Sequence, residues 1–333
     1  MKHILISLAA LALVASCQKA PEERSSSSDE PKTALVTFLL EDSEMSRATS
    51  SGNESIIEKA QVAVYNAAGT LLAVGDAENG AVSLRVPIGE SGCFALALAN
   101  SAADLTDYGT QSSLVNLQST LGANRAASLN GLEMSGTLSN ITFVEDYTGT
   151  ISLVRYAAKV EIDKIVNAIP GNPKLTIKGI YLINVNTKTR YDFYVSALSW
   201  SQKRAYTASE TNITPYTADI FTAEVNGGGN YSTPHYFYCY QNPTTTDSSS
   251  ESWSARYTRL VVEASYSGHD YYYPINIKGD DGRLNYNTSY IISKLTITGP
   301  GSDSPDKPIT KGGASFNLSV VTWSSGISQE VEI

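Results

Sequence analysis

Apolar and polar residues alternate along much of this sequence, which is the pattern of strands buried on one face. A short helix is expected near 111–121. Strands are predicted at residues 34–40, 60–75 with a turn at 66–69, 81–89, 93–100, 148–165, 175–186, 191–198, 234–242, 256–268, 271–279, 286–299 and 315–323. Strands at this spacing, without helices between them, favour β-sandwiches, so the predicted fold class is all-β.

Residues 148–165 are predicted to form one long strand or two joined strands. One face would carry Val154, Tyr156, Ala158, Val160 and Ile162. We place a domain boundary here, which divides the chain into an N-terminal sandwich at 48–152 and a C-terminal sandwich at 153–333.

The first predicted strand is apolar on both faces, because Val36, Phe38 and Leu40 alternate with Leu35 and Leu39. We therefore expect both faces to be buried. It could equally be a permanent strand of a sandwich.

The segment 41–55 behind this strand is acidic and serine-rich, the kind of segment where proteolysis concentrates. Its single basic residue is Arg47. Arg24 and Lys32 precede the strand, so cutting there would not separate it from the rest. The bond from Arg47 to Ala48 is thus the best candidate for cleavage; the alternative is a solvated surface arginine.

The chain begins with a positively charged residue and an apolar stretch at 4–14, which is too short to span a bilayer. It predicts a signal peptide at 1–16. The residues Val14-Ala15-Ser16-Cys17 resemble a bacterial lipobox, which makes Cys17 the predicted lipidation site. An ordinary signal peptide with an incidental cysteine is the alternative. Residues 17–33 are polar and predict a flexible tether.

The C-terminal segment is also strand-like. Its apolar positions are Phe316, Leu318, Val320, Ile327, Val331 and Ile333. Val321 and Trp323 shift the phase, which indicates a bulge or bend. Part of this segment could be the last strand of its own domain, and part could be a strand that pairs elsewhere. The sequence does not fix the boundary between these two parts.

Composition narrows the function classes. The net charge of −9, without a basic patch, argues against a nucleic-acid partner. His235 and His269 have no ligands at metal spacing, and no catalytic motif occurs, so we predict no enzyme, metal or cofactor.

Cys93 and Cys239 either form a disulfide or are buried free thiols. The tyrosines at 236–238 and 271–273 suggest a glycan-binding platform or ordinary strand residues.

Several segments, in order, resemble the fimbrillins, the subunits of type V pili of Bacteroidales. These are ANSAADL at 99–105, LEMSG at 132–136 as a Met-Ser-Gly turn, VRYAAKVEI at 154–162, YFYCYQNPT at 236–244, and LNYNTSYIISKLTITGPGSDSPDKP at 284–308. The resemblance implies two tandem, transthyretin-like β-sandwiches and a structural subunit of a cell-surface fimbrium that supports adhesion.

It also implies a mechanism. The precursor would be an outer membrane lipoprotein, and an Arg- or Lys-specific protease would cut at Arg47–Ala48. The strand carrying Leu35, Val36, Phe38 and Leu40 would then leave. A donor strand from the C-terminus of an identical or related pilin would replace it. The predicted donor residues are Phe316, Leu318, Val320, Ile327, Val331 and Ile333. A host or bacterial surface receptor is a further possible partner. The alternative function is a monomeric, glycan-binding surface lipoprotein that keeps its lipid.

Overall fold

The computed structural model describes most of the chain after the predicted tether. The described residues are 32–42, 54, 56–121, 131–186, 188–194, 200–201, 218–245, 256–307, 309, 313–322 and 325–332, with the side chains of 200–201, 316–319, 321–322 and 325–332 left out. Strands dominate this part of the chain, which confirms the all-β prediction. None of the helices in these ranges is long and apolar enough to cross a membrane.

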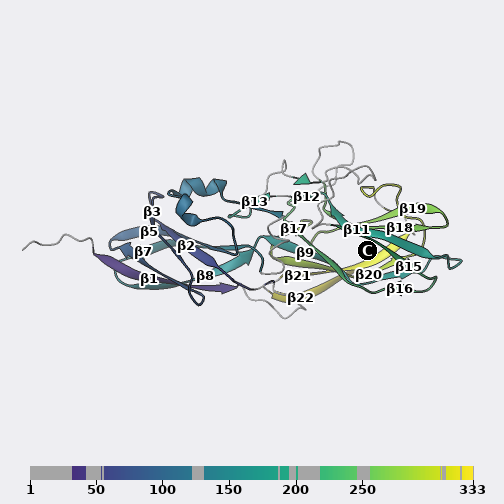
Figure 1. Cartoon of the computed structure of the whole chain (residues 1–333), viewed down its shortest axis with the longest axis horizontal. Helices are drawn as coiled ribbons and strands as arrows, with labels where there is room; N and C mark the ends of the chain where they lie inside the picture. The colour runs from purple at the N-terminus through teal and green to yellow at the C-terminus, as the bar shows by residue number, and fades with distance from the viewer. Residues whose placement is uncertain are drawn as a thin grey trace, which may run out of the picture. The chain divides into compact units, whose positions relative to one another are not determined.

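The first sheet has seven strands in the order β3-β2-β5-β7-β8-β1-β4 (Figure 1). They are β1 (Thr33–Asp42), β2 (Ala60–Tyr65), β3 (Leu71–Asp76), β4 (Ala81–Pro87), β5 (Glu90–Ala99), β7 (Met134–Phe143) and β8 (Tyr147–Arg155). β7 and β8 pair only at Met134–Arg155 and Ser135–Val154. The sheet can therefore fold over at this short junction.

One core fills the space between the two halves of this sheet. It takes alternate residues from β1, β4 and β8 on one side and from β2, β5 and β7 on the other. The opposite face of β5 is also buried. There Leu96 and Leu98 pack with Leu105 of η1 (Leu105–Asp107) and Leu114 of η2 (Gln111–Asn116). The short helix expected near 111–121 is thus this 3₁₀ helix.

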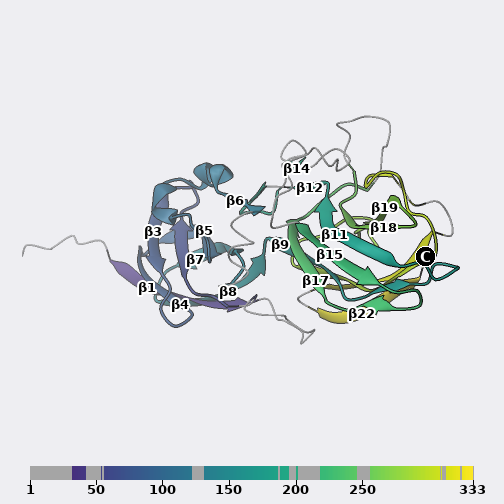
Figure 2. The ribbon, with the colours of Figure 1, turned by 45° about the vertical axis from the view of Figure 1, so that its right-hand side comes forward.

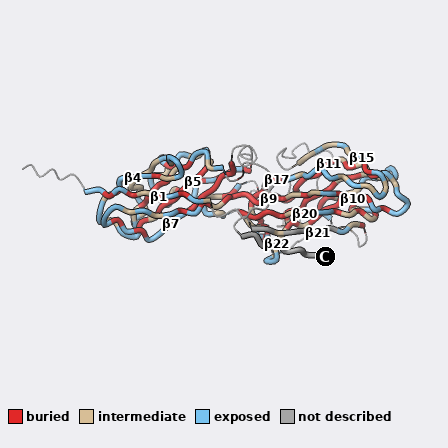
Figure 3. The backbone as a smooth tube through the Cα atoms, turned by 90° about the horizontal axis from the view of Figure 1, so that it is seen from below, coloured by how far each residue is buried: buried red, intermediate tan, exposed pale blue. Residues whose placement is uncertain are grey.

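A second core lies between two further sheets (Figure 2). One holds β9 (Ala157–Ile162), β10 (Ile165–Asn167), β16 (Asn230–Tyr231), β17 (His235–Tyr240), β20 (Thr288–Ile297), β21 (Ala314–Thr322) and β22 (Ser325–Glu332). The other runs β15-β11-β18-β19, with bounds Ala218–Val225, Leu175–Ile183, Arg259–Tyr266 and His269–Asn276. Figure 3 shows buried residues concentrated along strands such as β9, β11 and β20.

Two pairs of short strands complete the described elements. β6 (Gln118–Thr120) pairs with β13 (Lys188–Arg190), and β12 (Val185–Asn186) pairs with β14 (Trp200–Ser201). The predicted turn at 66–69 joins β2 to β3; there the Asn66 side chain accepts hydrogen bonds from the main chain of Ala68 and Thr70. Asn66 thus stabilises the hairpin locally.

Segment 148–165 contains two joined strands, β8 and β9. The prediction that Val154 shares a face with the apolar residues from Tyr156 to Ile162 is wrong. Ile151 and Leu153 supply the buried face of β8, whereas the buried face of β9 has even-numbered residues such as Ala158. The break at Tyr156 shifts the alternation by one residue, so the two strands face different cores.

Two other expectations from the sequence are wrong for the residues that the structure describes. Tyr191–Tyr194 form a turn rather than a strand, because Phe193 has a φ of +63° and its ring stacks on Tyr286. The expected Met-Ser-Gly turn lies inside strand β7. A Cβ at Gly136 would approach the Ser152 carbonyl oxygen to 2.3 Å, so this glycine permits close packing of the strands.

Candidate functional site

The first strand lies inside its sheet rather than at an edge. Residues 33–39 pair antiparallel with 81–87 of β4, and residues 36–42 pair parallel with 147–153 of β8. β1 is therefore the main-chain link between these two strands. Taking it away would leave unpaired N–H and C=O groups on both neighbours.

Alternate residues of β1 enter the core. Ala34, Val36, Phe38 and Leu40 are at most 8% exposed. The expectation that both faces are buried is wrong, since Leu35 and Leu39 are each 41% exposed. β1 follows the pattern of a sheet with one face against the core and one toward solvent. Burial of its apolar row stabilises the strand by roughly 1.5–3 kcal/mol for each large side chain.

The strand ends on an ion pair. Asp42, the last residue of β1, contacts the guanidinium of Arg155, the last residue of β8. The Arg155 side chain is fully buried, and the Asp42 side chain is 20% exposed. The two residues meet because parallel strands bring their C-terminal ends to one edge.

Arg155 also holds residues from two other parts of the chain. Its Nε donates a hydrogen bond to the main-chain oxygen of Glu54 at 3.1 Å. Its Nη1 donates to Oδ1 of Asn287 at 3.2 Å. One guanidinium thus contacts the residues on both sides of segment 43–53.

Glu54 is buried among further charged groups. Its carboxylate lies 3.3 Å from Nζ of Lys159 and accepts a hydrogen bond from the hydroxyl of Tyr238. Lys159 also pairs with Glu161 at 3.0 Å. Lys159 and Tyr238 are partners across β9 and β17, so the pocket for Glu54 is built from two paired strands.

Burial shifts the pKa values in this group. Loss of solvent raises the pKa of Asp42 above its usual range, although the Arg155 charge and hydrogen bond act in the opposite direction. Burial, followed by the Glu54 charge, raises the pKa of Tyr238, so its hydroxyl stays a donor to Glu54. We call Asp42, Glu54, Arg155, Lys159 and Asn287 the strand-end cluster.

Sequence reasoning chose other residues for this region. The predicted cleavage residues Arg47 and Ala48 and the predicted lipidation site Cys17 lie outside the described residues. Arg155 and Lys159 lie in segment 154–162, whose one functional signal in the sequence is its resemblance to fimbrillins. Asp42 and Glu54 were missed, since an acidic residue in an acidic, serine-rich segment gives no signal of burial.

The C-terminal segment forms two strands. β21, with Phe316, Leu318 and Val320, pairs with β20 on one side and β22 on the other. β22 contains Ile327 and Val331 and is the last strand in the described order of its sheet, while Ile333 lies outside the described residues. The expected irregularity is present as a register shift between Val320 and Thr322.

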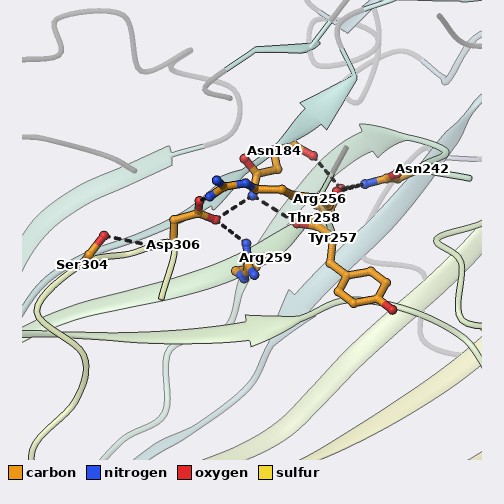
Figure 4. Close-up of polar contacts among 8 residues, drawn as sticks. All are labelled: Asn184, Asn242, Arg256, Tyr257, Thr258, Arg259, Ser304 and Asp306. Atoms are coloured by element: carbon orange, nitrogen blue, oxygen red, sulfur yellow. Dashed lines mark hydrogen bonds and ion pairs between the residues drawn. The ribbon is translucent and has the colours of Figure 1, made fainter. Parts of the chain in front are cut away.

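A second buried polar cluster fixes the segment after β20 (Figure 4). Asp306 is 6% exposed and forms ion pairs with Arg256 and Arg259. Nδ2 of Asn184 donates to Oδ1 of Asp306 at 3.0 Å. Ser302 exchanges main-chain hydrogen bonds with Tyr272, which extends the edge of β19. The cluster has the form of a structural anchor for residues 299–307.

The remaining candidate residues, a histidine and two cysteines, have structural surroundings in the described part of the chain. His235 bonds Asp219 through Nδ1 at 2.7 Å and Tyr231 through Nε2 at 2.9 Å, and it stacks on Phe221. Among the described ranges, no three His, Cys, Asp or Glu side chains are grouped to hold a metal. Cys93 and Cys239 are buried free thiols, which settles the question of pairing.

Each tyrosine segment is buried at its C-terminal end. Tyr236 is 41% exposed, whereas Phe237 and Tyr238 are buried. In the other segment, Tyr271 and Tyr272 are partly buried and Tyr273 is fully buried. Most of these rings therefore pack as ordinary strand residues.

No family model matches the chain, and no curated protein matches it. Solved structures do. A predicted cell adhesion protein from Parabacteroides distasonis ATCC 8503 has a TM-score of 0.64 at 19% identity, covering 89% of this chain and 99% of that one. A fimbrilin from Porphyromonas gingivalis W83 has a TM-score of 0.63 at 18% identity, covering 88% and 98%.

The tip fimbrial protein Mfa3 from Porphyromonas gingivalis is also similar, with a TM-score of 0.52, 13% identity, and coverage of 88% and 100%. The TM-scores show a shared fold, and at identities of 13–19% the similarity carries no statement about function. The chain has the fold of fimbrillin-like proteins, so the resemblance found in the sequence is confirmed at the level of the fold.

Proposed function

We propose that this chain is a structural subunit of a surface fimbrium, assembled by exchange of its first strand and supporting adhesion, rather than an enzyme. The observation that carries the proposal is the place of β1, an internal strand with an apolar inner face next to residues 43–53. Its removal would open a groove between β4 and β8 that another strand could fill. The fold shared with a fimbrilin and a tip fimbrial protein supports the same function.

The proposed sequence of events starts with export as an outer membrane lipoprotein through Cys17. An Arg- or Lys-specific protease then cuts at Arg47–Ala48, and residues up to Arg47, with the lipid, leave. The partner is an identical or related subunit at the cell surface. We further propose a division into sandwiches at 48–152 and 153–333, which the two cores on either side of Tyr156 support.

The donor is proposed to be the C-terminal strand of the next subunit. β22 is the better candidate than β21, because β21 already has a hydrogen-bonded strand on each side. We therefore assign Ile327, Val331 and Ile333 to the donor. Phe316, Leu318 and Val320 are then assigned to the home sheet of their own subunit.

The test is the N-terminal sequence and intact mass of protein taken from the cell surface, with electron microscopy of the same fractions. We expect a start at Ala48 in filaments, and neither the start nor the filaments in Arg47→Ala. Lys32→Ala, which changes a basic residue ahead of the strand, is the matched control and should still polymerise. A lipidated start at Cys17 in monomers only would contradict the proposal.

A further inference from the structure

We propose that the ion pair between Asp42 and Arg155 is a retention contact, which holds the first strand in its groove after the chain has been cut. The inference rests on the proposed function, because it concerns the strand that we propose to leave. It assigns a role to two charged residues that neither the apolar groove nor the cleavage bond explains.

The pair lies on the side of the strand where the chain would be cut. Asp42 ends β1, and residues 43–53, with Arg47, follow it. A cut after Arg47 breaks the main chain but leaves every described contact of β1 in place. The two hydrogen-bonded ladders, the apolar row and the ion pair would all have to be lost before the strand could leave.

Arg155 is held by groups that stay with the subunit. Its guanidinium donates to the main-chain oxygen of Glu54 and to Asn287, and its side chain is fully buried. The positive charge cannot follow the strand into solvent. When β1 leaves, it takes the Asp42 carboxylate away from a fixed, buried cation. Removing the counter-charge of a buried cation is unfavourable, even where forming the pair adds little.

The proposed donor carries no acidic side chain on its apolar face. The charged residues of β22 are Glu330 and Glu332, which alternate with Ile327 and Val331. Successive side chains of a strand point to opposite faces. A donor that places Ile327 and Val331 in the groove therefore directs both glutamates outward. The ion pair belongs to the uncut and freshly cut subunit alone.

The contact would therefore delay the opening of the groove. A cut subunit whose own strand stays bound keeps the edges of β4 and β8 that face β1 paired, and unpaired edges cause aggregation. The donor must displace the strand through its main-chain and apolar contacts. The retention contact thus separates the cleavage of the chain from the exchange of the strand in time.

The test measures release of the fragment that ends at Arg47. Full chain beginning at residue 18 is cut after Arg47, and the fragment is separated from the remainder by size exclusion and identified by mass. We expect Asp42→Asn to release the fragment roughly tenfold faster or more, because it removes the charge but keeps the shape. Asp42→Glu should stay near the wild-type rate. Glu41→Gln changes the exposed neighbouring acid and should have no effect.

Equal release from Asp42→Asn and wild type would overturn the retention contact. If no variant releases its fragment in buffer, the urea concentration at which the fragment separates takes the place of the rate. A lower midpoint for Asp42→Asn then supports the contact, and an unchanged midpoint overturns it. If the wild type releases its fragment but forms no filaments, the proposed exchange fails, while the comparison of release remains valid.

Discussion

Charged residues are buried in both the strand-end cluster and the surroundings of Asp306. Arg155 and Lys159 are at most 2% exposed, and Asp306 is 6% exposed. Such groups are stable inside a protein only when opposite charges and hydrogen-bond partners surround them. Each cluster joins segments that are far apart in sequence, so it contributes to the choice of one arrangement of strands and connections.

Asp306→Asn tests the second cluster. It removes the negative charge that the buried Arg259 shares with the partly buried Arg256. We expect the free energy of unfolding to fall by about 3–5 kcal/mol in urea denaturation. Asp303→Asn is the control, since this side chain in the same segment is 79% exposed and should change stability by less than about 0.5 kcal/mol. Equal effects would show that burial of Asp306 is unimportant.

Asp163 predicts a pH dependence of stability. Burial, followed by the charge of Glu161, raises the pKa of Asp163 to about 6. The pKa of Asp163 is higher in the folded protein than in the unfolded chain. Asp163 therefore contributes to stability below its unfolded pKa, and this contribution is lost as the pH rises through about 6. Asp163→Asn does not titrate. Its stability relative to wild type should increase by about 1–2 kcal/mol between pH 4 and 7.5 in urea titrations; a pH-independent difference would contradict this.

The two buried thiols give a simpler test. Burial raises the pKa of Cys239 to about 12 and also raises that of Cys93. Because the thiolate is the reactive form, neither cysteine should react with a thiol reagent in native protein that begins at residue 18. Both should react in guanidinium chloride without a reductant. A requirement for reductant would indicate a disulfide instead.

At the scale of elements, β1 is unusual because its burial is proposed to be temporary. Phe38→Ala should destabilise the uncut protein by about 3–5 kcal/mol in urea denaturation, since Phe38 is fully buried. Leu35→Ala, on the exposed face, should cost under about 1 kcal/mol. Under the proposed exchange β1 leaves before filaments form, so Phe38→Ala should leave the dissociation of filaments in urea unchanged. A weakened filament would mean that β1 remains in place.

The elements that sequence could predict are those with strict alternation or a clear turn. The hairpin of β2 and β3 is one, because Asn66 to Gly69 separates two apolar runs. β7 was missed, since Ser135, Gly136 and Ser139 interrupt its apolar positions. The exposure of Leu39 was also missed, because apolar residues on both faces cannot reveal which face a second layer covers.

At the scale of the whole molecule, the sequence predicted the fold class but not the pairing of strands. β1 lies parallel to β8, and β9 lies parallel to β20. Both pairs join segments more than 100 residues apart, and alternation within a strand carries no information about its neighbour. The strand-end cluster depends on this pairing, because Asp42 and Arg155 meet only when β1 and β8 end together. The strand-end cluster could therefore not be predicted from the sequence.

The parallel ladder to β8 and the antiparallel ladder to β4 also determine how the strand in this groove would bear tension. Hydrogen bonds in a sheet run across the strands. A pull along the strand axis therefore loads both ladders in shear, so many bonds must fail together rather than one after another. A donor strand in the same position would join its subunit to the next by a link that resists stretching far better than peeling.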